Sequence, residues 1–449
     1  MNRERLNLII FIVILAVYLV GQGLIGTYHP VEKEFYFDKP ADADFLYYGA
    51  IINQVMNDFP PNNPAFGGEN LTQPFLQYYP GAILAQLFYP YNAIRILNVI
   101  YLILFAYLLR RYFPTTYGFG LMAIFAASAP LVNLNALGVD FIARGFTHVP
   151  FFILLTITLF SKDLKWRLGS IFVASMINGY MMLMVLPCLG IFWLIERKRM
   201  NLYIVISAIA GMLLASVYIS TGAVDKPFYF IFAESFKFAP KEIIMHAIPF
   251  IILSLFYRNT RGIIFLAAAV IFGSLIHYNP FFPIFLVYYA GALIVLERDS
   301  SFGFAPNFRY LILSIIFLAF IYESYDKYNP QKGGYYPHYD GRVQSSIEWI
   351  KQNTEPNDVF IAMTTEDNEL AFLMESRPVY LGYAGHVAHL GYNWKERHDN
   401  MVRLYNMGMP IKNVNYLYYG PIERRYFPGA QIPFEIAHRD NYVTIYKLQ

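Results

Sequence analysis

Charged residues are scarce in this chain of 449 residues: only 14% are Asp, Glu, Lys or Arg, whereas 57% are hydrophobic and 18% aromatic. Soluble domains carry about 25% charged residues, so the composition excludes an ordinary soluble protein. No basic cluster suggests nucleic-acid binding. The net charge of +3 says little, because in membrane proteins the placement of Lys and Arg matters more than their sum. The sequence therefore predicts an α-helical polytopic membrane protein.

Cysteine is almost absent. The single residue, Cys188, lies within an apolar run, which excludes an intramolecular disulfide and makes a thiolate metal site improbable. A cleavable signal peptide is not indicated either. The first apolar run, residues 6–25, follows MNRER, is about 20 residues long and has no clean small-residue cleavage site. We therefore expect it to remain as a transmembrane helix.

A helix needs about 20 apolar residues to cross about 30 Å of hydrocarbon, and on that basis we expect about 11 transmembrane helices, some of them short. They cover residues 6–26, 91–109, 117–134, 148–160, 168–179, 181–195, 202–220, 243–257, 262–277, 280–296 and 310–322.

Orientation decides whether the fifth and sixth of these segments form one helix that is broken at Asn178. With 11 crossings, one set of basic groups that flank the spans falls on a single face, which the positive-inside rule makes cytoplasmic. The set is Arg3, Arg5, Arg110, Arg111, Lys162 to Arg167, Arg197 to Arg199, Arg258, Arg261, Arg298 and Arg309. One fewer crossing would move several basic groups outside, so we predict two helices. In the plasma membrane the N-terminus is then cytoplasmic and the C-terminal region extracytoplasmic.

The opposite face collects long polar segments: the first outer loop, at about 28–90, and the loops at 135–148 and 221–242. Loops of this length are usually functional or disordered. The first is too rich in Phe, Tyr and Ile to be a disordered linker, so we expect it to fold back onto the protein.

After Tyr322 the composition changes. We expect a transmembrane domain over 1–322, a polar linker over 323–340 and an extracytoplasmic α/β domain over 341–449. The spacing of apolar residues and the turn residues between segments predict helices at 342–352, 367–375 and 395–407. They predict strands at 358–365, 377–383, 414–420 and 441–448.

Two carboxylates, Asp42 and Asp44, precede an apolar helical stretch at 45–56 in the first outer loop. Two interpretations stay open. Asp favours helix N-caps and is stabilised by the helix dipole; equally, a carboxylate at a helix start is well placed as a general base or metal ligand. The rigid turn FPPNNPAFGG at 59–68 either redirects the chain or helps to place that carboxylate.

In the second loop, Asp140, Arg144 and His148 recur every four residues and would share one face of a helix. Arg binds phosphate with two hydrogen bonds, so Arg144 and His148 suit an anionic ligand. An interfacial ion pair between Asp140 and Arg144 is the alternative. Lys226 and Lys237 of the third loop are open to the same two interpretations.

A basic, His-rich stretch in the C-terminal region contains His386, His389 and Arg397. It either contacts an acceptor above the membrane or is an exposed polar loop.

Several stretches resemble a known family. DADFLYYGAIINQVMNDFPPNNPAFGGENL followed by QYYPGAIL near the N-terminus, and RPVYLGYAGHVAHLG, ERHDNMVRLY and VNYLYYGPIERR near the C-terminus, are similar to archaeal and bacterial multispanning proteins known for a YYY motif. The plan of the chain resembles the GT-C superfamily of polyprenyl-phosphate-dependent glycosyltransferases. The chain has QYY in place of a full YYY, and it lacks a WWDYG-type motif, which argues against an oligosaccharyltransferase.

This resemblance implies an inverting transfer of a sugar from a polyprenyl-phosphate-linked donor, within the membrane, to an unknown acceptor outside. Asp44 matches the family's catalytic carboxylate, and Asp42 would support it. The donor phosphate would be bound by Arg144, His148, Lys226 and Lys237. A divalent metal, Mg or Mn, is possible, with Asp42, Asp44 and Asp140 as candidate ligands.

A lipid or solute transporter is the alternative from another functional class. Transporters usually show paired, interrupted spans and charges near the bilayer midplane. The predicted spans here have almost no charge at their centres and no visible halves, which favours the enzyme.

Overall fold

The computed structural model describes residues 3–21, 27–29, 34–36, 43–71, 75–88, 90–125, 145–219, 240–257, 259–275, 281–296, 344–363, 377–382 and 392–448. The chain forms two compact units. The first contains Met1–Phe37, Arg95–Val217 and Ile231–Gly334, and the second contains Asp38–Ile94, Tyr218–Phe230 and Tyr335–Gln449. Much of the first outer loop therefore groups with the C-terminal residues. The domain bounds expected from composition, 1–322, 323–340 and 341–449, stay predictions.

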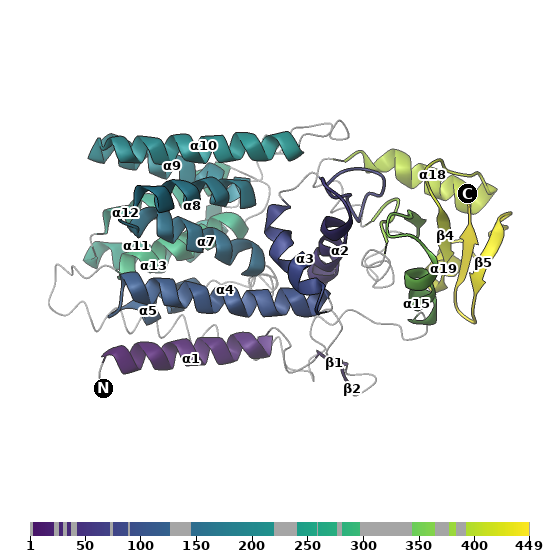
Figure 1. Ribbon diagram of the computed structural model, residues 1–449, viewed down its shortest axis with the longest axis horizontal. Helices are drawn as coiled ribbons and strands as arrows, with labels where there is room; N and C mark the ends of the chain where they lie inside the picture. Colours follow the sequence, from purple (N-terminus) through teal and green to yellow (C-terminus); the bar gives the residue numbers. More distant parts are fainter. Residues whose placement is uncertain are drawn as a thin grey trace. The chain divides into compact units, whose positions relative to one another are not determined.

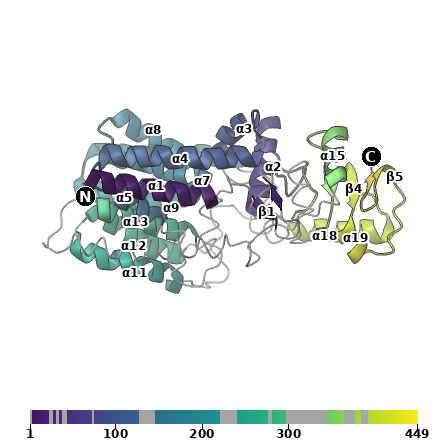
Figure 2. The ribbon, with the colours of Figure 1, turned by 90° about the horizontal axis from the view of Figure 1, so that it is seen from below.

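The first unit is a bundle of helices that run roughly parallel to one another in both views (Figures 1 and 2). They are α1 (Arg3–Gly21), α4 (Pro90–Tyr112), α5 (Tyr117–Phe125), α7 (Gly145–Phe160), α8 (Leu164–Ile177), α9 (Gly179–Glu196), α10 (Arg199–Ile219), α11 (Pro240–Phe256), α12 (Thr260–Leu275) and α13 (Phe281–Leu296). A short hairpin pairs β1 (Thr27–His29) with β2 (Glu34–Tyr36).

Each predicted span from the first to the tenth overlaps one of these helices, and the segment at 310–322 lies outside the described residues. Two helical stretches in the described part, Asn92–Tyr112 and Arg199–Val217, are long and apolar enough by themselves to cross a membrane, and several shorter apolar helices accompany them. The count of 11 therefore stays a prediction. Leu194, Leu213 and Val217 are each more than 60% exposed, as expected of side chains that face lipid.

Helix α13 forms the centre of the bundle and packs against α5, α9, α11 and α12. Its residues from Ile284 to Leu296 are all buried, and a helix that is apolar all round belongs in a core. Small residues allow the close packing: a Cβ on Gly262 of α12 would lie 2.6 Å from Cγ1 of Ile294.

The chain breaks between α8 and α9 at Asn178, as predicted. Asn178 leaves the helical region with φ −144° and ψ 83°, and its side-chain oxygen accepts a hydrogen bond from the Met181 amide at 3.1 Å. That bond caps the N-terminus of α9. At the C-terminal end of α8, the Asn178 amide donates a hydrogen bond to the Ala174 carbonyl at 3.0 Å. The fifth and sixth predicted spans are therefore separate helices.

The second unit combines α2 (Ala43–Asn57), a 3-10 turn at Leu76–Tyr78 and α3 (Tyr79–Ala85) with the C-terminal elements. The latter are α15 (Gln344–Asn353), β3 (Phe360–Ile361), α18 (Trp394–Met407), β4 (Tyr416–Tyr419), α19 (Pro421–Tyr426), β5 (Glu435–Arg439) and β6 (Thr444–Lys447). The strands form one mixed sheet in the order β3-β4-β6-β5, in which only β3 and β4 are parallel.

The α/β character of the C-terminal region is confirmed, with two corrections. The segment at 377–383 was expected to be a strand, but its described residues, 377–382, form no regular strand and pair with the sheet through an isolated bridge between Val379 and Phe360. Strand β5 and helix α19 were not expected. The predicted helix at 367–375 lies outside the described residues.

Candidate functional site

Helix α2 carries the candidate catalytic carboxylate. It begins at Ala43, so Asp44 lies in its first turn, where the helix dipole favours a negative charge. Further along, Ala50, Ile51 and Ile52 are fully buried. The ring of Tyr48 lies 6.0 Å from that of Tyr78 in the QYY segment. The Tyr-rich elements that carry the family resemblance thus pack against each other and anchor the helix that bears Asp44.

The turn that follows α2 is closed by its own hydrogen bonds. The Asn63 amide donates to the Glu69 carbonyl at 2.7 Å, and the Leu71 amide donates to the Pro61 carbonyl at 2.8 Å. Nδ2 of Asn62 donates to the carboxylate of Asp58 at 3.0 Å. Residues 58–71, which we call the PPNNP loop, are therefore a folded structure, as the sequence predicted.

The PPNNP loop is also bonded to the segment at 377–382. The Gly67 amide donates to the Val379 carbonyl at 2.7 Å, and the Val379 amide donates to the Pro64 carbonyl at 2.9 Å. The Gly382 amide donates to the Ala65 carbonyl at 2.7 Å. These are backbone bonds of the kind that adds a strand to a sheet edge. They make the first outer loop and the C-terminal region one folded unit.

Arg397, on α18, contacts both the PPNNP loop and the segment at 377–382. Its guanidinium lies 3.5 Å from the Phe66 ring centroid and 4.7 Å from that of Tyr380. Nη1 donates to the carbonyls of Gly67, at 2.8 Å, and Tyr380, at 2.6 Å, while Nη2 lies 3.6 Å from the Glu69 carboxylate. Burial lowers the pKa of Arg397 from its ordinary value, but the guanidinium keeps its charge. The contacts described for Arg397 join two parts of the protein, and its role in binding an acceptor stays a prediction.

His148 lies in the first turn of α7 and is only 2% exposed. Its ring packs against Phe285 of α13, with 4.6 Å between centroids. The remaining candidates, namely Asp42, Asp140, Arg144, Lys226, Lys237, His386 and His389, lie outside the described residues. The arrangement of the donor-phosphate group, and its distance from Asp44, therefore stay predictions.

No three His, Cys, Asp or Glu side chains converge on a possible metal position within the described part of the chain. Of the three candidate ligands, only Asp44 lies in a described element. Metal binding stays a prediction.

Glu423 is a buried charge that the sequence reading did not single out. Its carboxylate accepts from the Gly420 amide at 2.9 Å and from the Met363 amide at 2.7 Å. It therefore caps α19 and ties that helix to the chain just after β3. Burial raises the pKa of this carboxyl to about 7. The GPIER pattern contained the signal, because Pro at the first helical position and Glu two positions later are typical of a helix start.

Comparison with known proteins identifies the fold. No family model matches the sequence, and no curated protein matches it. Among solved structures, ArnT from Cupriavidus metallidurans bound to undecaprenyl phosphate superimposes with a TM-score of 0.57, at 12% identity, over 98% of each chain. The apo state of the same protein gives 0.57 and 12% over 98% of this chain and 97% of ArnT. The chain has the ArnT fold.

The likeness to ArnT covers the helical bundle and the C-terminal sheet in one alignment, since almost nothing of either chain is left out. It shows that the chain shares the overall fold of ArnT. At 12% identity it shows the fold alone.

Proposed function

We propose that this protein is a membrane glycosyltransferase that takes a sugar from a polyprenyl-phosphate-linked donor and passes it to an acceptor on the extracytoplasmic face. The observation that carries the proposal is the ArnT fold over 98% of the chain, in a structure that holds undecaprenyl phosphate. The motifs of the first outer loop and the C-terminal region point to the same class. The likeness to ArnT does not favour the transporter alternative.

In this mechanism Asp44 is the general base. It removes the proton of the acceptor hydroxyl as that oxygen attacks the anomeric carbon of the donor sugar. The bond between the anomeric carbon and the phosphate oxygen breaks, the electron pair leaves with the lipid phosphate, and attack from the opposite face inverts the anomeric centre. Asp42 supports Asp44. Charge that develops on the leaving phosphate is stabilised by fixed donors, for which the candidates are Arg144, His148, Lys226 and Lys237.

The general base is tested by Asp44→Asn in membranes supplied with a lipid-linked sugar donor. Losing a general base costs about 10²–10⁴ in rate, so we expect transfer to fall by at least about 100-fold while the amount of folded protein is unchanged. Asp399→Asn is the matched control, because Asp399 has a side chain that is 70% exposed on α18. Transfer at the wild-type rate by Asp44→Asn would overturn the mechanism. Movement of unmodified substrate across vesicles, without a transferred sugar, would support the transporter.

A divalent cation, Mg or Mn, is proposed as a possible cofactor, with Asp42, Asp44 and Asp140 as the residues that would hold it. Carboxylate oxygens suit such cations, and a bound cation would neutralise charge on the donor phosphate. Treatment with a chelator, followed by addition of Mg or Mn, tests this. We expect transfer to stop and to return with the metal, whereas activity that survives chelation would show that no exchangeable cation is needed.

A further inference from the structure

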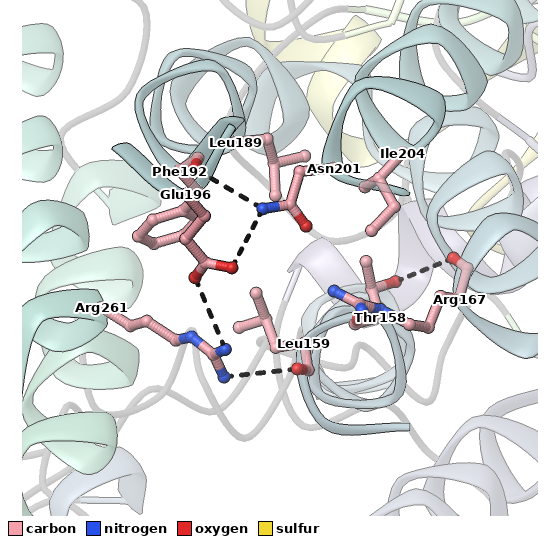
Figure 3. Close-up of a pocket in the computed structure, with 9 residues that line it drawn as sticks. All are labelled: Thr158, Leu159, Arg167, Leu189, Phe192, Glu196, Asn201, Ile204 and Arg261. Atoms are coloured by element: carbon pink, nitrogen blue, oxygen red, sulfur yellow. Dashed lines mark hydrogen bonds and ion pairs between the residues drawn. The ribbon is translucent and has the colours of Figure 1, made fainter. Parts of the chain in front are cut away.

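A polar pocket lies within the first unit, at the end of the bundle where α7 and α9 stop and α8, α10 and α12 begin (Figure 3). Its polar side chains come from five different helices: Thr158, Arg167, Glu196, Asn201 and Arg261. The positive-inside rule predicts that this end is cytoplasmic, opposite to the face of the proposed transferase site. The transferase mechanism uses none of these residues.

Arg167 is 9% exposed and fixed in place. Its Nε donates to the Thr158 carbonyl at 2.6 Å, and Nη1 lies 3.1 Å from the Met200 sulfur. Nη2 has no hydrogen-bond partner among the described residues. A largely buried guanidinium that is held by these two contacts, with one donor unused among the described residues, suits an anion.

Arg261 reaches the same space from the first turn of α12 and is held only loosely. Its side chain is 33% exposed, and Nη2 lies 3.9 Å from the Glu196 carboxylate, at the far end of ion-pair range. Nη1 donates to the Leu159 carbonyl at 3.4 Å. Figure 3 shows the guanidinium groups of Arg167 and Arg261 pointing into one space, and the two charges repel each other.

The carboxylate of Glu196 lies within ion-pair distance of more than one cationic side chain. Glu196 also lies 3.1 Å from Nζ of Lys198 and accepts from Asn201 at 3.3 Å. Lys198 and Arg261 thus pair with the same carboxylate, and Arg167 adds a third positive charge to its surroundings. The first turns of α8, α10 and α12 add the positive ends of three helix dipoles, which outnumber the negative ends of α7 and α9. The pocket therefore has an excess of positive charge.

The chemistry of the surroundings indicates where an anion would come from. Trp166 is 67% exposed beside Arg167, and Tyr203 is 48% exposed on α10; such aromatic residues are typical of the membrane–water interface. Leu159, Leu189 and Ile204 provide apolar lining. Basic pockets between helices on the cytoplasmic side suit anionic lipid head groups.

We propose that this pocket binds a phosphate group, supplied either by an anionic phospholipid of the adjoining leaflet or by a soluble phosphate, through Arg167 and Arg261. The inference does not rest on the transferase function, because binding can be measured without turnover.

The test uses full-length protein, purified and delipidated in detergent. Three additions are compared: phosphatidylglycerol, phosphatidylcholine and inorganic phosphate. The readouts are the thermal unfolding midpoint and the lipid retained in native mass spectrometry. We expect phosphatidylglycerol, inorganic phosphate or both to raise the midpoint, and phosphatidylcholine to leave it unchanged. Arg261→Gln should weaken this binding by about tenfold, the loss of one charge-assisted hydrogen bond. Arg111→Gln, an exposed arginine at the end of α4, is the matched control and should bind like the wild type.

Protection by phosphatidylglycerol alone would identify a lipid head group, and equal protection by inorganic phosphate would identify a soluble ligand. Either outcome supports the site when Arg261→Gln weakens the binding by about tenfold. Unchanged binding in Arg261→Gln, or an equal loss in Arg111→Gln, would overturn the proposal in favour of nonspecific charge attraction. Arg167→Gln should weaken binding at least as much. If that variant fails to fold, the more exposed Arg261 still decides the question.

Discussion

Glu423 makes the stability of the second unit depend on pH. Because burial raises the pKa of its carboxyl from 4.5 to about 7, the folded state binds a proton more tightly than the unfolded state. The stabilisation is complete below pH 4.5 and is lost as the pH rises through about 7. A shift of this size corresponds to about 3 kcal/mol.

We therefore expect the thermal unfolding midpoint to fall between pH 5 and pH 8, and Glu423→Gln to reduce that slope. Circular dichroism of the purified full-length protein at the two pH values measures it. Asp440 does not interfere, because its pKa is lowered to about 2, and its own contribution is lost only below pH 4. Equal slopes in wild type and Glu423→Gln would show that Glu423 is not the group responsible.

Arg397 should matter more for structure than its position in a basic stretch suggests. Lys cannot reproduce a planar guanidinium stacked between two rings with two carbonyl acceptors. We expect Arg397→Lys to destabilise the second unit by about 1–2 kcal/mol and Arg397→Ala by about 3 kcal/mol. Hydrogen exchange at the amides of Gly67 and Val379 should become faster in both. Arg403→Ala, an exposed arginine on the same helix, should have no effect, and slow exchange retained in Arg397→Ala would contradict the role.

At the scale of elements, the helices were predictable because apolar length and local caps determine them. The break at Asn178 followed from charge placement before any geometry was known. The conformation of 377–382 was not predictable in the same way. Three of its backbone bonds go to the PPNNP loop, at Pro64, Ala65 and Gly67, and no local pattern records a partner so distant in the sequence. Strand β5 was missed because only Ile436 and Ala437 of its five residues are apolar, a weak period-2 signal.

The residues of the candidate site also differ in how far the sequence alone predicted their surroundings. Asp44 was expected just before a helix at 45–56 and lies instead in the first turn of α2, which begins at Ala43. Arg397 was considered as an acceptor contact or part of an exposed loop because it belongs to a basic, His-rich stretch with His386 and His389. Its spacing of four and seven residues from the buried Met401 and Leu404 also indicated that it faces the interior of the unit. The pocket around Arg167 and Arg261 depends on five helices meeting at one end, which the sequence alone does not show.

At the scale of the whole molecule, the predicted orientation can be tested with single cysteines. The native Cys188 is fully buried, so Cys188→Ala provides an unreactive background. Lys162, between α7 and α8, and Lys412, after α18, are both exposed. A membrane-impermeant maleimide applied to intact cells should label Lys412→Cys, and it should label Lys162→Cys only after permeabilisation. The reverse pattern would place the C-terminal sheet in the cytoplasm and contradict an extracytoplasmic transferase.

The bonds between the PPNNP loop and the C-terminal region also set the order of events during biosynthesis. Arg397 and Gly67 are 330 residues apart. At a synthesis rate of about 5–20 residues per second, roughly 15–65 s separate their emergence from the ribosome. The PPNNP loop is thus synthesised early, and its hydrogen bonds to the segment at 377–382 form only after the last quarter of the chain follows it. A nascent chain that stalls within the bundle has helix α2 but not the bonds between the PPNNP loop and the C-terminal region, so the second unit is completed only at the end of translation.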